Sequence, residues 1–237
     1  MTNVIARLRT IVWCAGALLV LLVVPGAVSA GQLAGDTAPK LTGAALIKEL
    51  QKGGYVIYFR HGITAEHGEK DVSDADLEDC ARQRNLSDAG QAQTKEIGAA
   101  FKGLRIPTGE VYASPYCRCV DTARNIFGKV TKSKALHFAI HLRTTDRTSI
   151  TAQLLDLLAK VPAPGTNNAL VSHTANLQEA VGIWPKPEGV AHVFKPKGDG
   201  TFTYVGMMQP EAWMAEAKKA DGGLASPGGW LDWMRGR

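Results

Sequence analysis

Apolar residues along this chain fall into short unbroken blocks and into longer stretches where they recur every three or four positions. The blocks are typical of strands covered on both faces, and the longer stretches are typical of amphipathic helices. The predicted strands are 55–59, 110–114, 136–142, 168–172 and two strands within 189–207. The predicted helices are 42–52, one opening at Ser87, 115–127, 149–161, a short one after 173, and 210–220.

Strands and helices alternate along most of the chain, and this order predicts the fold class. We expect an α/β three-layer sandwich, with a mainly parallel central sheet flanked by helices. Residues 62–86 carry many charges without any period, which predicts a long surface loop. Sheets of this class place their sites at the carboxyl ends of their strands.

Cationic or ionisable residues follow three of the predicted strands. Arg60 and His61 end the first strand, the segment 114–118 follows the second, and His173 ends the strand 168–172. Three segments that are distant in sequence therefore bring such side chains toward one edge of the sheet.

The first thirty residues are set apart as an expected export signal. Arg7 and Arg9 precede an apolar run from Ile11 to Val24, and small residues precede a break between Ala30 and Gly31. A retained membrane anchor is the alternative, but the run is shorter than the roughly 20 residues that span a bilayer. We expect cleavage, a periplasmic or secreted protein that is no longer bound to the membrane, and a single domain over 31–237.

Charge and cysteine content change this picture little. The leader holds two of the 27 basic residues and none of the 22 acidic ones, so its removal lowers the formal net charge from +5 to +3. The lysines are scattered without a basic stripe, so no nucleic-acid partner is expected. Cys80 could form a disulfide with either Cys117 or Cys119, which are too close together to pair naturally, although three buried thiols remain the alternative.

Two arginines and two histidines gathered at one edge would repel one another without an anion between them. Like charges about 4 Å apart cost on the order of 4 kcal/mol at an effective dielectric of 20. A phosphoryl group reverses this effect, because its oxygens match the guanidinium fork. The arginines also lower the imidazole pKa, which keeps a histidine neutral and nucleophilic near pH 7.

Four segments resemble the histidine phosphatase superfamily, which has the phosphoglycerate mutase-like fold. "FRHGIT" at 59–64 is similar to its Arg-His-Gly triplet, and "RNLSDAGQAQ" at 84–93 is similar to the segment that opens its next helix. "ASPYCRCVDTA" at 113–123 resembles its Ser-Pro-x-x-Arg stretch, and "LVSHTANL" at 170–177 resembles its second histidine. The four segments also follow the family order.

The resemblance implies that His61 is a nucleophile that becomes a phosphohistidine. It implies a phosphate pocket made by Arg60, Arg118 and His173, with Thr64 as a further ligand. Transfer in line needs a nucleophile, donors around the phosphoryl oxygens and a proton donor for the leaving alcohol. The arginines would supply the positive charge, so neither a metal nor another cofactor is expected.

The proton donor is left open between two carboxylates. One branch of the family has an Asp directly after the second histidine, where this chain has Thr174. Glu188 precedes a late strand and would reach the site edge if that strand is antiparallel. Asp146 is the other candidate, as the acid or as a substrate-binding residue, and Glu66 is a distant third. His137 and His141 would share a face of the strand 136–142, but no further metal ligand accompanies them.

The leading hypothesis is an exported phosphatase that hydrolyses a small phosphomonoester, such as a phosphosugar, through a phosphohistidine. A mutase of glycolytic intermediates would use the same cluster, but export would separate it from such substrates. The alternatives are a phosphate-binding protein of the same fold without turnover and a scaffold in which Arg-His-Gly only forms a turn. The oligomeric state does not follow from the sequence.

Overall fold

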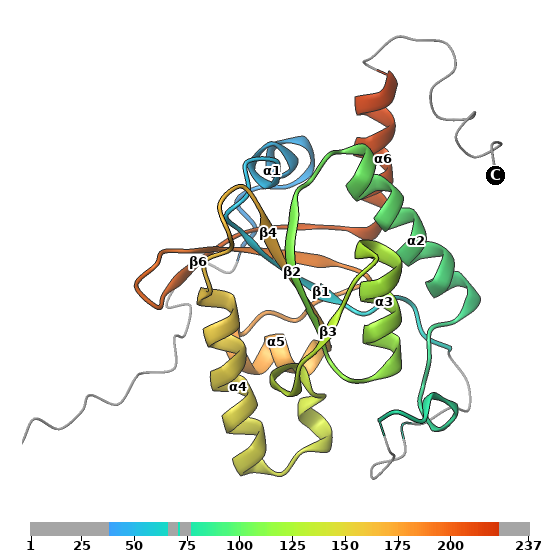
Figure 1. Ribbon diagram of the computed structural model, residues 1–237, viewed down its shortest axis with the longest axis vertical. Coiled ribbons are helices and arrows are strands. Elements are labelled where there is room, and N and C mark those ends of the chain that lie inside the picture. The colour runs from blue at the N-terminus through green and yellow to red at the C-terminus, as the bar shows by residue number, and fades with distance from the viewer. Residues whose placement is uncertain (1–37, 66–70, 72–76, 223–237) are drawn as a thin grey trace, which may run out of the picture.

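A six-stranded sheet forms the centre of the computed structural model, which describes residues 38–65, 71 and 77–222. The strand order is β3-β2-β4-β1-β5-β6 (Figure 1). The strands are β1 (Val56–Arg60), β2 (Thr108–Ala113), β3 (Thr131–Lys132), β4 (Asn167–Ser172), β5 (Ala191–Pro196) and β6 (Phe202–Met208). The first four are mutually parallel, and β5 runs antiparallel to both β1 and β6.

Helices cover both faces of the sheet, which confirms the predicted α/β class (Figure 1). They are α1 (Gly43–Leu50), α2 (Asp88–Gly103), α3 (Cys117–Phe127), α4 (Thr144–Ala159), α5 (Thr174–Val181) and α6 (Pro210–Gly222). Helices α1, α2, α3 and α6 contribute to one hydrophobic core, and α4 and α5 contribute to the core on the opposite face.

Strand β1 shows why the short apolar blocks become central strands. Successive side chains of a strand point to opposite faces, so Ile57 and Phe59 enter the core that contains Trp213. Val56 and Tyr58 enter the other core. Burying each large apolar side chain contributes about 1.5–3 kcal/mol, which favours a position covered by helices on both sides.

The prediction of a strand over 136–142 is wrong. The segment holds parts of two 3-10 helices, η2 (Lys134–Leu136) and η3 (Ala139–His141). The Asn176 amide donates to the carbonyl oxygen of His137 at 2.7 Å, and its Oδ1 accepts from the Ala139 amide at 3.3 Å. A side chain of α5 thus satisfies backbone groups that a strand would pair with a neighbour.

Smaller differences concern the ends of elements. Helix α4 begins at Thr144, five residues before the expected start, because its first turn is polar and carries no apolar period. The two-residue strand β3 was not predicted. The expected leader, 1–30, lies outside the described residues, and so does Glu66. No helix within the described part of the chain is long and apolar enough to cross a membrane.

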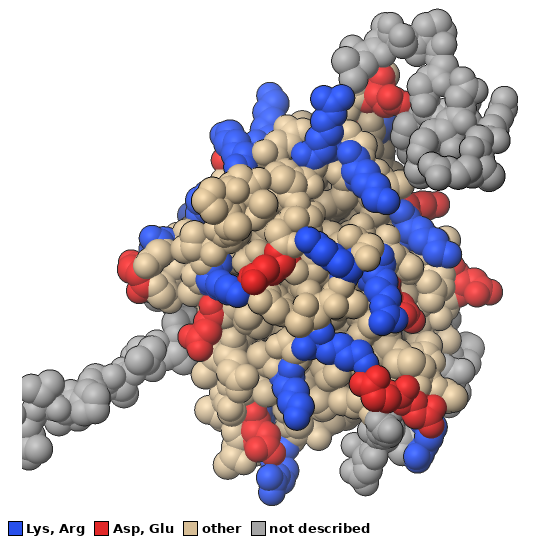
Figure 2. Space-filling view, viewed as in Figure 1, with Lys and Arg blue, Asp and Glu red and all other residues tan. Residues whose placement is uncertain are grey.

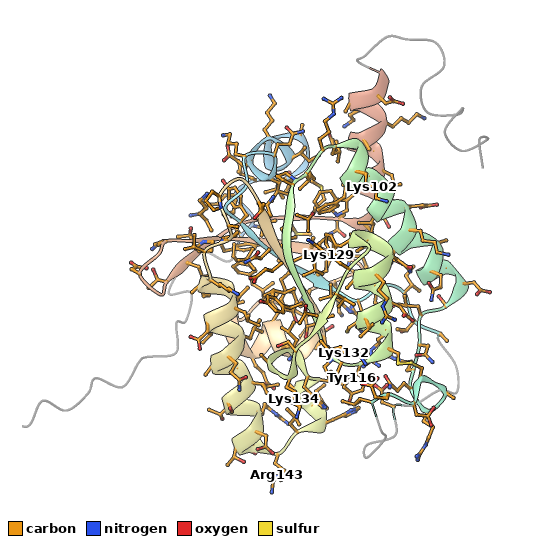
Figure 3. The ribbon with its side chains drawn as sticks, in the orientation of Figure 1. Lys102, Tyr116, Lys129, Lys132, Lys134 and Arg143 are labelled. Atoms are coloured by element: carbon orange, nitrogen blue, oxygen red, sulfur yellow. A yellow bond between two sulfur atoms is a disulfide. The ribbon has the colours of Figure 1, made fainter. Side chains whose placement is uncertain are left out.

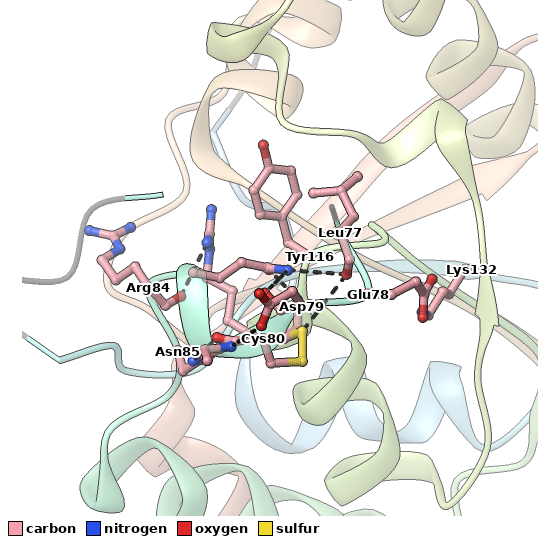
Figure 4. Close-up of a disulfide and its surroundings, with 12 residues drawn as sticks. Leu77, Glu78, Asp79, Cys80, Arg84, Asn85, Tyr116 and Lys132 are labelled. Carbon is pink, nitrogen blue, oxygen red and sulfur yellow. Dashed lines mark hydrogen bonds and ion pairs between the residues drawn. A yellow bond between two sulfur atoms is a disulfide. The ribbon is translucent and has the colours of Figure 1, made fainter. Parts of the chain in front are cut away.

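A disulfide joins the loop before α2 to the first residue of α3 (Figure 4). Cys80, at the start of the 3-10 helix η1 (Cys80–Arg82), pairs with Cys117. This confirms one of the two expected pairings and leaves Cys119 as a buried free thiol. The backbone amide of Cys117 also donates to the Gln83 side chain at 2.9 Å, so this part of the loop is fixed against α3.

Candidate active site

The sheet register brings the predicted site segments to one edge. Arg60 is the register partner of Ser172, at the end of β4, and the backbone amide of His61 donates to the Ser172 carbonyl at 3.0 Å. Strand β5 starts at this same edge because it runs antiparallel to β1. The amide of Gly189 therefore reaches the His61 carbonyl at 2.9 Å and places Glu188 beside the cluster.

Among the described residues, one ring nitrogen of His61 has a hydrogen-bond partner and the other has none. Its Nδ1 lies 2.9 Å from the carbonyl oxygen of Gly62. Because a carbonyl only accepts, Nδ1 carries the proton and Nε2 carries the lone pair. The side chain is only 2% exposed, which holds the ring in this orientation. The arrangement presents a nucleophilic nitrogen at the end of β1.

The glycine after His61 is required by close packing against α2. A Cβ on Gly62 would lie 2.5 Å from Cγ2 of Thr94. The amide of Gly62 donates to the Thr122 hydroxyl at 2.9 Å, and this hydroxyl donates to the carbonyl of Arg118 at 2.7 Å. Threonine in α3 thus connects the turn that carries His61 to the helix that carries Arg118.

Both active-site histidines are neutral in this environment. Burial lowers the pKa of His61 well below its ordinary 6.5, and the positive charge of Arg118 lowers it further. Burial, Arg118 and His61 likewise lower the pKa of His173. The two ring centres are 5.6 Å apart, so a bound anion would contact both imidazoles.

Both ring nitrogens of His173 are engaged. Nε2 lies 2.8 Å from the Ser114 hydroxyl, and Nδ1 lies 3.4 Å from an Nη2 donor of Arg118. The Tyr58 hydroxyl donates to the His173 carbonyl at 2.6 Å. Phe138 packs against the ring with centroids 4.5 Å apart. These contacts hold His173 in place beside Arg118.

The Cys119 thiol fills the remaining space beside His173. Its sulfur lies 3.6 Å from Nε2 of this histidine. Burial raises the pKa of the thiol to about 12, so it is protonated and packs as a small apolar group.

Arg118 is fully buried, and of the nearby cations it has the largest effect on the pKa values of the two histidines. Its Nη1 donates to Asp71 Oδ1 at 2.7 Å and to the Arg84 carbonyl at 3.2 Å. The guanidinium lies over the Tyr116 ring, 4.7 Å from the centroid. Its Nε has no hydrogen-bond partner among the described residues. A buried cation with an unused donor suits an incoming anion.

Arg60 pairs with Glu188 on the other side of His61. Its Nη2 donates to Glu188 Oε1 at 3.1 Å, and this oxygen also accepts from the Thr64 hydroxyl at 3.0 Å. The backbone amide of Thr64 donates to Oε2 at 3.1 Å. Oε1 lies 3.9 Å from Nδ1 of His61, so the carboxylate approaches the nucleophile from the side opposite its free nitrogen.

Two residues join this cluster without having been singled out from the sequence. Arg84 lines the same cleft as Arg60, and its positive charge also lowers the pKa of His61 and His173. Asp71 accepts from Arg118 across 47 positions of sequence. Both lie in the charged segment 62–86, where no hydrophobic period marks position. The one available indication was that Arg84 closely precedes Ser87, the N-cap of α2.

The polar cleft beside the cluster has a volume of about 870 Å³. It is lined by Arg60, Ile63, Thr64, Ala65, Arg84, Lys186, Pro187 and Glu188. Its walls come from the end of β1, the segment after it and the segment before β5. Three cations in the lining favour an anionic ligand.

Asp146 lies apart from this cluster. It is in the first turn of α4, where it accepts from Arg143 Nε at 3.1 Å, and it lines a separate cavity of about 650 Å³ with His137. His137 and His141 do not share a strand face, and His141 instead contacts the Tyr116 hydroxyl at 2.8 Å. Within the described ranges, no group of three or more metal-ligating side chains comes together.

Known proteins provide an independent comparison. Residues 56–141 match the family model described as the histidine phosphatase superfamily, branch 1. The matched part contains Arg60, His61 and Arg118 but ends before His173. No curated protein matches this chain.

Three of the similar solved structures carry phosphatase names and have low sequence identity to this chain. The protein histidine phosphatase SixA complexed with tungstate is 17% identical, with 66% of this chain and 97% of that chain covered and a TM-score of 0.49. A phosphoserine phosphatase mutant from Entamoeba histolytica is 16% identical, with 67% and 98% covered and a TM-score of 0.43. A mycobacterial glucosyl-3-phosphoglycerate phosphatase is 15% identical, with 64% and 96% covered and a TM-score of 0.44.

The family model thus matches the part of the chain that carries Arg60, His61 and Arg118, and the sheet brings His173 to the same cluster. Through residues 56–141, this chain is similar to the histidine phosphatase superfamily, branch 1.

Proposed function

We propose that this protein is an exported phosphatase that hydrolyses a small phosphomonoester through a phosphohistidine on His61. One observation carries this proposal: a buried, neutral imidazole has Nδ1 bonded to a carbonyl and Nε2 free beside buried guanidinium groups. A neutral nitrogen can attack phosphorus, whereas an imidazolium cannot.

In the first half-reaction, the phosphoryl group binds between Arg60 and Arg118. Nε2 of His61 attacks phosphorus in line with the ester oxygen, and the P–O bond to the alcohol breaks as the N–P bond forms. Fixed positive charge stabilises the phosphoryl oxygens without reorganisation. His173 supports them from beside Arg118, where its position is set by Ser114.

In the second half-reaction, water attacks the phosphorus of the phosphohistidine. The N–P bond breaks, inorganic phosphate forms, and the lone pair returns to Nε2. The hydrogen bond from Nδ1 to the Gly62 carbonyl keeps the imidazole in the same tautomer through both steps.

Glu188 has a positioning role in this proposal. The sequence made it the first candidate for the proton donor, but both of its oxygens accept hydrogen bonds, from Arg60 and Thr64. Both carboxylate oxygens are thus occupied in holding Arg60 and Thr64. It also lies on the Nδ1 side of His61, away from the leaving group in an in-line transfer. Glu188 therefore orients Arg60 and Thr64 toward the phosphate.

The cleft favours a hydrophilic substrate such as a phosphosugar. Arg84 and Lys186 lie in its lining beyond Arg60, with no aromatic side chain among the residues that line it. On the outer face over β2 and β3, basic and acidic side chains are interspersed (Figure 2). Lys132, labelled with Lys129 and Lys134 in Figure 3, donates to Glu78 at 2.6 Å. A mixed surface of this kind supports a small substrate rather than a nucleic acid.

Export is proposed from the leader and is compatible with the disulfide. Disulfides persist in oxidising compartments, and Cys80–Cys117 joins two segments that form the site. Expression of the full chain in a bacterium should yield a protein in the periplasm or medium whose N-terminus, by mass spectrometry, is Gly31. An intact N-terminus at Met1 in the membrane fraction would favour the anchor.

Steady-state assays test the phosphatase activity. The mature protein should release inorganic phosphate from a panel of phosphomonoesters, and His61→Ala should abolish release. His192→Ala is the matched control. His192 is similarly buried, but its ring contacts the hydroxyl of Tyr204, which belongs to the core under α4 and α5. Phosphate binding with neither product nor phosphorylated protein would favour the alternative of a binding protein without turnover.

A further inference from the structure

We propose that Asp71 is the proton donor for the leaving alcohol and the base that activates water in the second half-reaction. This inference rests on the proposed phosphatase activity. Asp71 was not among the carboxylates that the sequence indicated, because it lies in the charged segment 62–86.

The first observation is the position of the carboxylate. Oδ1 of Asp71 accepts from Arg118 Nη1 at 2.7 Å and from the backbone amide of Arg84 at 3.1 Å. The side chain is 8% exposed. Arg118 in turn reaches His173, so Asp71 occupies a place on the guanidinium where a phosphoryl oxygen would bind.

The second observation is the difference between the two oxygens of Asp71. Both known contacts are made by Oδ1, and Oδ2 has no hydrogen-bond partner among the described residues. Glu188, by comparison, uses both oxygens as acceptors and lies near Nδ1 of His61. Of the two carboxylates, Asp71 has an oxygen that can carry a proton to substrate.

Substrate binding itself would cause Asp71 to take up the proton. A phosphate dianion that binds Arg118 displaces the carboxylate from its cation and adds negative charge beside it. Both changes favour the protonated carboxyl group. The charged and titratable groups that face Asp71 are Arg118 and Arg84, with Tyr116 and Cys119 close enough to sense its charge.

The proton balance closes over the two half-reactions. Asp71 takes a proton from solvent when substrate binds, and gives it to the ester oxygen as the P–O bond breaks and the N–P bond forms. The resulting carboxylate then takes a proton from the attacking water as the new O–P bond forms and the N–P bond breaks. As phosphate leaves, Asp71 releases this proton to solvent, which repays the proton taken up on binding, and the carboxylate pairs again with Arg118.

Leaving-group dependence tests this role. An alkyl phosphate such as glycerol phosphate needs protonation of its leaving oxygen, whereas p-nitrophenyl phosphate hardly does. Asp71→Asn should lower kcat for the alkyl ester by about 10²–10⁴-fold and for the aryl ester by less than about tenfold. Glu188→Gln should affect both esters equally.

Binding of inorganic phosphate separates catalysis from folding. Asp71→Asn should bind phosphate at least as tightly as the wild-type protein, because the competing carboxylate charge is gone. Equal losses on both esters, weaker phosphate binding, or leaving-group dependence in Glu188→Gln instead would overturn the assignment. A wild-type protein that hydrolyses neither ester would overturn the phosphatase proposal itself, and this result is distinct from a selective failure of Asp71→Asn.

Discussion

The two active-site histidines are alike in burial and charge but differ in how their nitrogens are used. His61 and His173 are 2% and 1% exposed, and both have a pKa well below 6.5. His61 engages only Nδ1, with a carbonyl, whereas His173 engages Nε2 with Ser114 and Nδ1 with Arg118. Neutrality alone therefore does not identify the nucleophile.

The hydrogen-bond partners assign the roles instead. A carbonyl partner leaves an imidazole with a free lone pair at the opposite nitrogen, as in His61. A hydroxyl on one side and a guanidinium on the other leave His173 as a fixed ligand of the phosphoryl group. The comparison predicts that replacement of the two histidines has different consequences.

The largest effect is expected from His61→Ala. Removal of a nucleophile should lower kcat by more than about 10³-fold, because no other neutral nitrogen among the described residues of the cluster has a free lone pair. Initial rates of phosphate release measure this loss. A residual activity within tenfold of the wild-type value would show that another group attacks phosphorus.

A smaller effect is expected from His173→Ala. The loss of one group that contacts the phosphoryl oxygens should lower kcat by about 10²–10³-fold. Phosphorylation of His61 should still be detectable, only more slowly formed, because the nucleophile remains. If this variant forms no phosphoenzyme although circular dichroism shows an intact fold, the nucleophile would be His173 and not His61.

Ser114→Ala should have a modest effect through His173. Loss of an orienting hydrogen bond of about 1–1.5 kcal/mol corresponds to roughly tenfold in kcat. The pH dependence of kcat should change as well, because Nε2 of His173 loses its partner. A tenfold loss that appears only in KM, with an unchanged pH profile, would mean that Ser114 affects substrate binding rather than the position of His173.

The smallest effect concerns stability against pH. Folded His61 and His173 have a pKa lowered below the unfolded value near 6.5, so below that pH the unfolded chain binds protons that the folded protein does not. The free energy of unfolding should be fully present above about pH 6.5 and fall below it, by at most about 1.4 kcal/mol per pH unit for each histidine. Denaturant unfolding between pH 7.5 and 5 measures this slope, and His173→Gln should reduce it. An unchanged slope would indicate that the ring is already protonated in the fold.

Much of the fold could be predicted because the sheet is buried on both faces. Apolar blocks such as Tyr55–Phe59 and the glycine-rich turn between β5 and β6 mark their elements directly. The segment 136–142 could not be assigned in this way, because an apolar pattern reports burial and not hydrogen-bond partners. Two of its backbone groups are instead bonded to Asn176, which is 37 positions from Ala139 and 39 from His137.

Site residues that directly follow strands could be predicted from the sequence. Site residues in the charged segment 62–86 could not. Arg60, His61 and His173 end strands whose edge position is set by topology. Arg84 is held in the cluster by its carbonyl, which accepts from Arg118, and Asp71 by its carboxylate, which accepts from Arg118 and from the Arg84 amide. No local sequence pattern encodes these long-range contacts.

Direct localisation of the covalent phosphate tests the central claim. The mature protein would be mixed with a phosphomonoester, quenched within milliseconds at alkaline pH, where phosphohistidine survives, and digested for tandem mass spectrometry. A phosphoryl group on His61, absent from His61→Ala, is the predicted result. A phosphoryl group on His173, or turnover without phosphorylation of any histidine, would contradict the account.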